Sequence, residues 1–205
     1  MLFRSVILLY RHSKAPVFFG DYVGNDDFDA AYKLGRYILE MGHRNIGLIC
    51  GPQNLTTGVE RHNGFLKAMS ESGIIVPKSM VFFGDFYQES GINGARKLLT
   101  AKKKPSLLAV MNNAMAFGVM TYLRQSGIEV PETVSMVSLG DIVNRELLYF
   151  LPTVISQNPL EIGKIAGRFL LQRILNPNKK PESVMIPGKI VIGNSVYDFR
   201  QLKPE

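Results

Sequence analysis

The stretch "SLLAVMNNAMAFGVMTYLRQSGIEVPETVSMVSL", residues 106–139, decides the fold. It opens and closes with apolar runs at 106–111 and 134–139, and such continuous hydrophobicity is typical of strands buried on both faces of a sheet. Between them lies a segment of helical length that begins near Asn113. A strand, a helix and a second strand in this order indicate a βαβ unit with two parallel strands.

The same alternation continues towards both ends of the chain. Further apolar runs that predict buried strands lie at residues 6–10, 46–50, 80–84 and 153–156. Amphipathic stretches of helical length separate them, and no repeat or Pro/Gly-rich linker divides the chain. The sequence therefore predicts the α/β class, with parallel sheets flanked by helices.

Polar residues mark the expected helix starts. Asp26 and Asp27 fit the N-cap of a helix that runs to about residue 41. Thr57 with Glu60 fits a capping box for a helix that ends near residue 73. A last long helix is expected from its cap, Asn158, to about residue 176.

The charge pattern raises the question of nucleic-acid binding, because the formal net charge is +7. Lysine and arginine are dispersed, however, and their only runs, at 102–104 and 179–180, fall at expected helix ends, where cations are favourable and stay hydrated. We therefore interpret the runs as solvated surface, with direct DNA contact as the weaker alternative.

Composition also indicates the compartment. A chain of 205 residues with 46% hydrophobic content can bury one or two cores. The single cysteine, Cys50, excludes an internal disulfide and suits a reducing compartment. The early apolar run at 5–10 is too short for a membrane span or a secretory signal. These features predict a cytoplasmic protein without membrane contact.

The inventory for catalysis is poor. His12, His43 and His62 have no metal-ligand spacing, so no metal site is expected. No phosphate-binding loop, dinucleotide fingerprint or GxSxG elbow is present, and no cofactor is expected. We predict that the protein is not an enzyme. An enzyme that uses two carboxylates, such as Asp85 and Asp141, is kept as a third hypothesis.

Polar and aromatic residues instead gather at the strand-to-helix corners, where open parallel sheets bind their ligands. Arg61 is either a solvated surface group or a ligand-binding fork, and Phe86 either stacks on a ligand or covers the core. Of the pair at 112–113, one asparagine can cap a helix and the other can bind a ligand. Asp141 and Gln157 end two further strands. This set favours hydrogen bonding to a guest over chemical reaction.

The ordered motifs are similar to those of one known family. They read "GNDDFDAAYKLGRYILEMGHRNIGLICGP", "ERHNGFLKAM", "GDFYQESG", "MNNAMAFGVMTYLRQSGIEVPETVSMVSLGD" and "LPTVISQNPLEIGKIAGRFLLQRI". Together they resemble the effector-binding core of the LacI/GalR bacterial transcriptional regulators, over residues 6–196. The resemblance implies a two-lobed, type I periplasmic-binding-protein-like fold with a small effector held in the cleft.

The resemblance also implies a division of the chain. Crossings between the lobes are expected near Pro52 to Asn54, near Ser156 to Asn158 and near Lys180. The N-terminal lobe would then comprise residues 1–52 and 158–180, and the C-terminal lobe residues 53–157 and 181–205. Because the family's DNA-binding headpiece and first βαβ units are absent from this sequence, the N-terminal lobe is expected to be incomplete. DNA would be bound only through a headpiece that these residues do not contain.

Site residues follow from the same motifs. By resemblance Arg61 matches the family's effector-contacting arginine, Asn112 its cleft asparagine, Phe86 its stacking aromatic and Gln157 the residue at the second crossing. Asp26 and Thr57 lie in cleft-lining motifs, and all six are expected to bind the ligand.

Two departures from the family pattern bear on the ligand. Gly140 occupies the place of the family's effector-binding aspartate, and Asp141 is expected to substitute for it. Leu55 stands where the purine-sensing members carry arginine, so a sugar or sugar derivative is expected rather than a purine.

The leading hypothesis is thus the effector-binding, homodimeric core of a LacI-type regulator. The alternative is a solute-binding protein of a sugar transport system, which has the same architecture. Upstream codons for a helix-turn-helix would favour the regulator, and a secretory leader would favour the transport protein.

Overall fold

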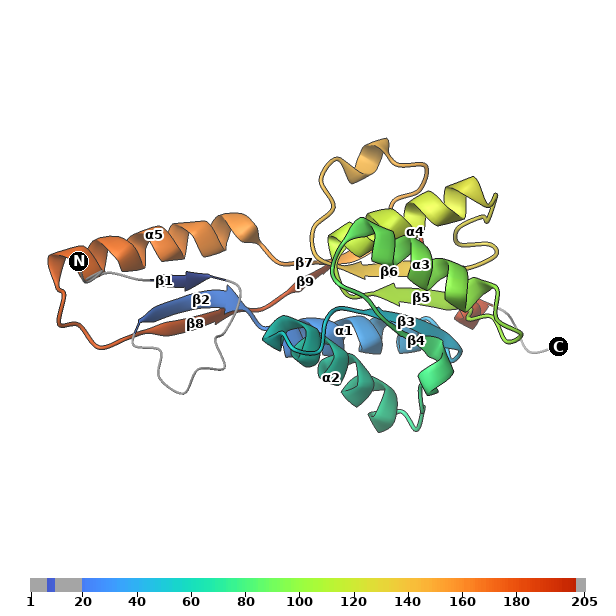
Figure 1. Cartoon of the computed structure of the whole chain (residues 1–205), viewed down its shortest axis with the longest axis horizontal. Helices are drawn as coiled ribbons and strands as arrows, with labels where there is room; N and C mark the ends of the chain where they lie inside the picture. The colour runs from blue at the N-terminus through green and yellow to red at the C-terminus, as the bar shows by residue number, and fades with distance from the viewer. Residues whose placement is uncertain (1–6, 10–19, 202–205) are drawn as a thin grey trace.

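The computed structural model describes residues 7–9 and 20–201. Two α/β bodies of unequal size lie end to end along the long axis of the molecule (Figure 1). The larger body is built on a six-stranded sheet and the smaller one on a three-stranded sheet.

The six-stranded sheet is parallel except at one edge. Its spatial order is β4 (Val81–Phe83), β3 (Ile46–Cys50), β5 (Leu107–Val110), β6 (Ser135–Leu139), β7 (Thr153–Ser156) and β9 (Lys189–Val191). The first five strands run parallel to their neighbours, and β9 pairs antiparallel with β7.

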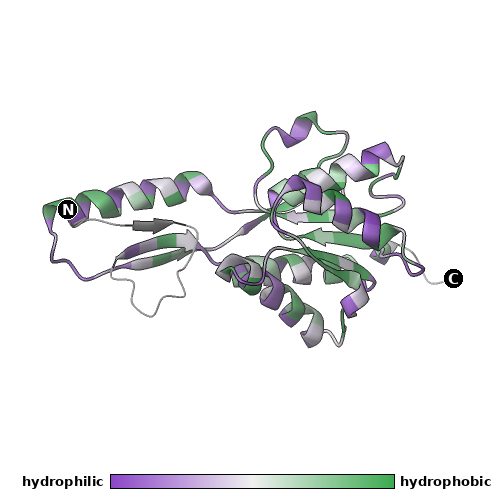
Figure 2. Cartoon of the chain, viewed as in Figure 1, coloured by the Kyte–Doolittle hydropathy of each residue, from purple (hydrophilic) through white to green (hydrophobic). Residues whose placement is uncertain are grey.

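Four helices cover the two faces of this sheet. Helices α1 (Asp27–Glu40) and α2 (Thr56–Glu71) pack together on one face, and α3 (Gln88–Leu99) and α4 (Asn113–Gln125) pack together on the other (Figure 1). Successive residues of β5 serve the two cores in turn, because side chains alternate along a strand: Leu107 lies in the α1/α2 core and Leu108 in the α3/α4 core. Figure 2 shows the resulting hydrophobic strands between amphipathic helices.

The smaller body has three parallel strands, β1 (Ile7–Leu9), β2 (Asp21–Asn25) and β8 (Ser183–Ile186), with β2 in the centre. Helix α5 (Pro159–Leu175) packs against this sheet and buries Phe169 and Ile162 on Val23. Arg173 of α5 also forms a buried ion pair with Asp21 of β2, with Nη2 2.7 Å from Oδ1.

Short 3-10 turns complete the elements, at Lys78–Met80, Arg145–Leu147 and Phe199–Gln201. Within the described residues no helix is both long and apolar enough to cross a bilayer.

The predicted α/β class is confirmed. All five apolar runs inside the described ranges contain strands, and the run at 6–10 contains β1. Val6 and Tyr10 of that run, and His12, lie outside the described residues. Strands β2, β8 and β9 were not predicted. Asp26 and Asn158 are N-caps as expected, whereas α2 starts one residue before Thr57 and has no side-chain cap, so the capping box was wrong.

The connections between the bodies correct two of the expected crossings. The chain first passes from the smaller to the larger body between β2 and α1, at Asn25 to Asp27, not at 52–54, because α1 and β3 already belong to the larger body. The second passage lies between β7 and α5, at 157–158, as expected. The third lies between β8 and β9, at 187–188, and not near Lys180.

Candidate functional site

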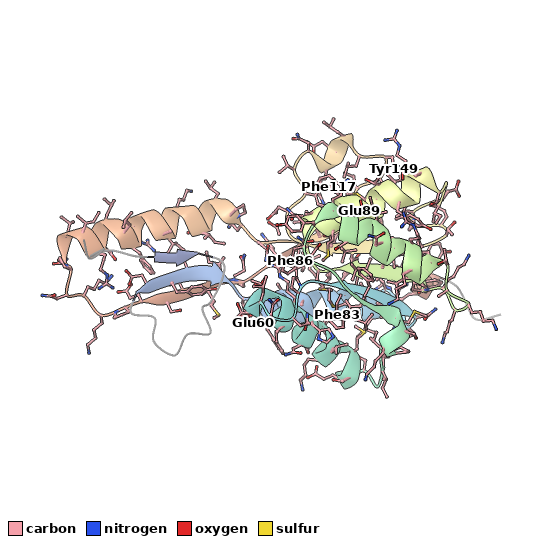
Figure 3. The ribbon with its side chains drawn as sticks, viewed as in Figure 1. Glu60, Phe83, Phe86, Glu89, Phe117 and Tyr149 are labelled. Carbon is pink, nitrogen blue, oxygen red and sulfur yellow. The ribbon has the colours of Figure 1, made fainter. Side chains whose placement is uncertain are left out.

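The parallel strands of the larger body all end at the same edge of their sheet, and the residues that follow them form a cavity of about 400 Å³. This volume is in the range of small-molecule sites. The lining residues are Thr57, Arg61, Asp85, Phe86, Tyr87, Asn112, Asn113 and Gln157. Phe86 lies at the end of the larger body that faces the smaller one (Figure 3).

Arg61 is fixed on the inner side of α2. It is only 7% exposed, its Nε donates to Oδ1 of Asp27 at 2.8 Å and its Nη1 donates to the carbonyl of Met111 at 2.7 Å. Helix α2 can approach α1 closely because Gly64 has no Cβ, which would lie 2.1 Å from the carbonyl oxygen of Phe28. Among the described residues Nη2 has no hydrogen-bond partner, so it is the part of the guanidinium available to a guest in the cavity.

Asp27 is the partner that sequence reasoning missed. Its side chain is 3% exposed, and its Oδ1 also accepts a hydrogen bond from Nε2 of Gln157 at 3.1 Å. Burial raises the pKa of the Asp27 carboxyl, and the charge of Arg61 opposes that rise. Asp27 lies at the first connection between the bodies and Gln157 at the second. The hydrogen bonds among Asp27, Arg61 and Gln157 therefore link both connections to the wall of the cavity.

Phe86 adopts a left-handed backbone conformation, with φ of 71°. Its carbonyl accepts a hydrogen bond from Nδ2 of Asn112 at 3.1 Å, and its ring centroid lies 5.8 Å from Cζ of Arg61. The ring occupies the space over Gly51, where a Cβ would lie 2.0 Å from a ring carbon. Strained backbone of this kind persists only where the surroundings hold it, and it is common at binding sites.

Asn112 and Asn113 have different roles, as the sequence predicted: one caps a helix and the other is available to a ligand. Asn112 is the N-cap of α4: its Oδ1 accepts from the backbone N–H of Met115 at 2.9 Å, so both ends of its amide are engaged. Asn113 donates from Nδ2 to the carbonyl of Asp141 at 3.0 Å. The amide of Asn113 is therefore freer for a ligand than that of Asn112, whose expected contact with the effector stays a prediction.

Two buried polar side chains lack partners among the described residues. Thr57 lines the cavity and is 7% exposed, yet its Oγ1 makes no hydrogen bond. Asn25 is buried at the carboxyl end of β2, and both polar atoms of its amide are unpaired. Because such atoms are costly unless something binds them, both point to a polar guest or to water at these positions.

Asp26 and Asp141 do not line the cavity. Oδ1 of Asp26 accepts from the backbone N–H of Asp29 at 2.8 Å and so caps α1. Oδ2 of Asp141 accepts from the backbone N–H of Gln157 at 2.9 Å, which holds the second connection beside the pocket. Contact between either carboxylate and an effector stays a prediction.

Asp85 and Tyr87 are further residues of the pocket wall that were not predicted as ligand contacts. Oδ1 of Asp85 accepts from the hydroxyl of Ser90 and from the backbone N–H of Tyr87, and these bonds lower the pKa of its carboxyl. The phrase "GDFYQESG" contained both residues, but neither has a spacing that marks a binding role.

The site offers donors, acceptors and one aromatic face. No cluster of three His, Cys, Asp or Glu side chains that could hold a metal occurs in the part of the chain that the structure describes. Cys50 is buried in β3, and burial raises the pKa of its thiol to about 12. The arrangement is therefore suited to holding a polar molecule by hydrogen bonds and stacking.

Two α/β bodies joined by three connections, with a polar pocket beside those connections, define the class of two-lobed ligand-binding proteins. Residues 36–196 match the family model of the periplasmic binding protein-like domain. The chain belongs to this family, and the resemblance of its motifs to the effector-binding core of LacI-type regulators is confirmed.

Individual relatives agree with this assignment. The HTH-type transcriptional repressor PurR of Shigella dysenteriae is 35% identical over 195 residues, which are 94% of this chain and 56% of the relative. The chain thus spans little more than half the length of the curated relatives it matches.

Solved structures show the same fold. A LacI family transcriptional regulator from Enterococcus faecium with bound ribose has a TM-score of 0.84 at 27% identity, covering 96% of this chain and 72% of that one. The transcriptional regulator CelR in complex with cellobiose also has a TM-score of 0.84 at 27% identity, covering 92% of this chain and 58% of that one.

Proposed function

We propose that this chain is the small-molecule-sensing core of a transcriptional regulator and that its pocket binds a sugar or sugar derivative. The main support for the proposal is that the expected contact residues lie close together. Five of the seven residues expected to contact an effector line one cavity at the carboxyl ends of the parallel strands: Thr57, Arg61, Phe86, Asn112 and Gln157.

The chemistry of the wall suits a hydroxylated ring. Nη2 of Arg61 can donate, the hydroxyl of Thr57 can donate and accept, and the carboxylate of Asp85 can accept. The ring of Phe86 offers a flat apolar surface for the C–H face of a sugar. The bound ribose and cellobiose in two structurally similar regulators support a ligand of this kind.

Signalling would follow from the position of the pocket beside the connections. A guest that contacts both bodies shifts their relative arrangement only if it binds one arrangement more tightly than the other. For the whole regulator we propose a homodimer that binds DNA, with the residues described here serving as the sensor. The names of the relatives support a regulator over the alternative of a transport protein.

Thr57→Val gives the sharpest test, because it removes the unpaired hydroxyl and keeps the shape of the side chain. The wild-type chain would be screened by thermal shift against neutral sugars, sugar phosphates and nucleobases, which could also stack on Phe86. A molecule that binds only the folded chain raises the melting temperature by mass action. We expect at least one neutral sugar to do so.

We expect Thr57→Val to raise the melting temperature of the free protein and to abolish the ligand-induced shift. The matched control is Thr121→Val on α4, whose hydroxyl is exposed and bonds the carbonyl of Phe117 at 2.8 Å. The control should keep the full ligand-induced shift. A shift that survives Thr57→Val unchanged, or that Thr121→Val abolishes, would contradict the proposed site.

A further inference from the structure

The pocket carries less positive charge than its arginine suggests. Arg61 is the one cation among the side chains that line it, and Asp85 adds a carboxylate to the same wall. Asp27 forms an ion pair with Arg61, with Oδ1 2.8 Å from Nε; burial raises the pKa of the Asp27 carboxyl, and the permanently charged guanidinium opposes that rise. One positive and two negative groups leave the set with a net charge of −1.

Burial strengthens the effect of this balance. Arg61 and Asp27 are 7% and 3% exposed, so water screens their charges much less than it would at the surface. An anion that entered the pocket would be attracted by the guanidinium of Arg61 and repelled by the buried carboxylate of Asp27, with a weaker repulsion from Asp85, which is exposed and screened by water. At the N-terminus of α4, Oδ1 of Asn112 already accepts the N–H of Met115, so this helix end is less open to an anion than the ends of α2 and α3, which have no side-chain cap.

The geometry of the guanidinium works in the same direction. Carboxylates and phosphates bind arginine best through two parallel N–H bonds on one edge of the fork. Nε is bonded to Asp27, and Nη1 is bonded to the carbonyl of Met111. Three N–H groups remain for a guest, two on Nη2 and one on Nη1, and the edge formed by Nε and Nη2 is closed to a bidentate oxyanion because Nε is already bonded to Asp27.

We propose that Asp27 is a specificity-determining residue that acts through Arg61 and restricts the pocket to uncharged polar guests, to the exclusion of phosphorylated or carboxylated ones. The inference rests on the proposed function, because it assumes that this pocket is the ligand site. Beyond that function, it assigns the choice between neutral and anionic ligands to the buried carboxylate of Asp27, which does not itself have to contact the ligand.

Asp27→Asn tests this directly, because asparagine keeps an oxygen that can accept from Nε of Arg61 while the negative charge is lost. The probe is inorganic phosphate at constant ionic strength, followed by thermal shift. We expect no phosphate-dependent shift for the wild type and a clear one for Asp27→Asn, with an apparent phosphate affinity at least about tenfold higher. Asp29→Asn is the matched control, since Asp29 lies on the same helix, pairs with Lys33 and does not line the pocket, and it should gain nothing.

A second measurement needs no variant. The wild type is tested with two pairs of ligands: ribose with ribose 5-phosphate, and glucose with glucose 6-phosphate. Whichever free sugar binds more tightly should bind at least about tenfold more tightly than its own phosphate. Equal or tighter binding of the phosphates overturns the inference, as does a folded Asp27→Asn without any gain for phosphate. Both outcomes leave the pocket as the ligand site. If no uncharged molecule of the panel binds the wild type, the proposed function fails, and the inference fails with it.

Discussion

The carboxylate of Asp27 and the guanidinium of Arg61 meet at 2.8 Å inside the larger body, although 34 residues separate them in the chain. The contact joins the first residue of α1 to the inner face of α2. It therefore serves two purposes at once: it packs two helices together, and it presents one edge of an arginine to the pocket.

Loss of either partner should be costly, because it leaves a buried charge without compensation. We expect Arg61→Ala and Asp27→Ala each to lower the free energy of unfolding by about 3–5 kcal/mol. The double variant Asp27→Leu/Arg61→Met should recover most of that loss, since apolar side chains of similar size replace the pair. Urea unfolding of the three variants measures this. Single losses below about 1 kcal/mol would show that the pair contributes little to the fold.

Asn112 should matter for stability as well as for the pocket. Asn112→Ala removes the cap of α4 and the bond to the carbonyl of Phe86, so we expect a loss of about 1–2 kcal/mol in the free energy of unfolding. Asn112→Asp should retain the cap. Asn113→Ala, which removes an exposed bond, should cost less than about 0.5 kcal/mol. Equal costs for the two alanine variants, measured by chemical denaturation, would argue against this division of roles.

The sequence predicted the parts of the fold in which the local signal is strong. The strands at 46–50, 107–110 and 135–139 are buried on both faces, and such strands require continuous apolar residues. The missed strands are β2 and β8 of the smaller body and the edge strand β9 of the larger sheet, and "DYVGN" and "KIV" have no apolar run long enough to identify them. The first crossing was misplaced for this reason: the boundary follows β2.

The sequence also predicted part of the candidate site and missed part of it. Strand ends could be located, and residues that follow parallel strands must meet at one edge of the sheet, so Arg61, Phe86 and Gln157 were found together. Asp27 was missed because a carboxylate in the first turn of a helix is already explained by the helix dipole. Its partner on another helix becomes visible only when α1 and α2 are packed.

Gly51 should be needed for the position of the Phe86 ring. A methyl group at this position would lie 2.0 Å from a ring carbon, so Gly51→Ala must displace Phe86. We expect the far-ultraviolet circular dichroism to stay unchanged and the ligand-induced thermal shift to fall severalfold. Gly163→Ala in α5 is the control, since a methyl there contacts nothing within 4 Å. Full ligand response in Gly51→Ala would show that the ring is not part of the site.

Stability should fall in acid because of His43. Burial lowers the pKa of this imidazole to about 4, with Nε2 bonded to the carbonyl of Tyr197 and Nδ1 to the hydroxyl of Ser106. Between its unfolded value near 6.5 and about 4 the unfolded chain binds a proton that the folded chain does not, so unfolding becomes easier as the pH falls.

The slope from this one group should approach about 1.4 kcal/mol per pH unit in that window. His43→Gln can keep a donor towards Tyr197 and cannot titrate, so it should flatten the dependence of unfolding free energy on pH between 6.5 and 4. Denaturant titrations at intervals of half a pH unit measure the slope. An unchanged slope in the variant would assign the acid sensitivity to other groups.

The most direct test of the central claim is a crystal structure of this chain with the uncharged sugar that gives the largest thermal shift. We predict that the sugar lies in the pocket at the carboxyl ends of β3 to β7, with a hydroxyl within hydrogen-bond distance of Nη2 of Arg61 and its ring against Phe86. Sugar bound elsewhere, for example in the hollow of about 600 Å³ beside Tyr149 and Arg124, with the Arg61 pocket empty, would contradict it.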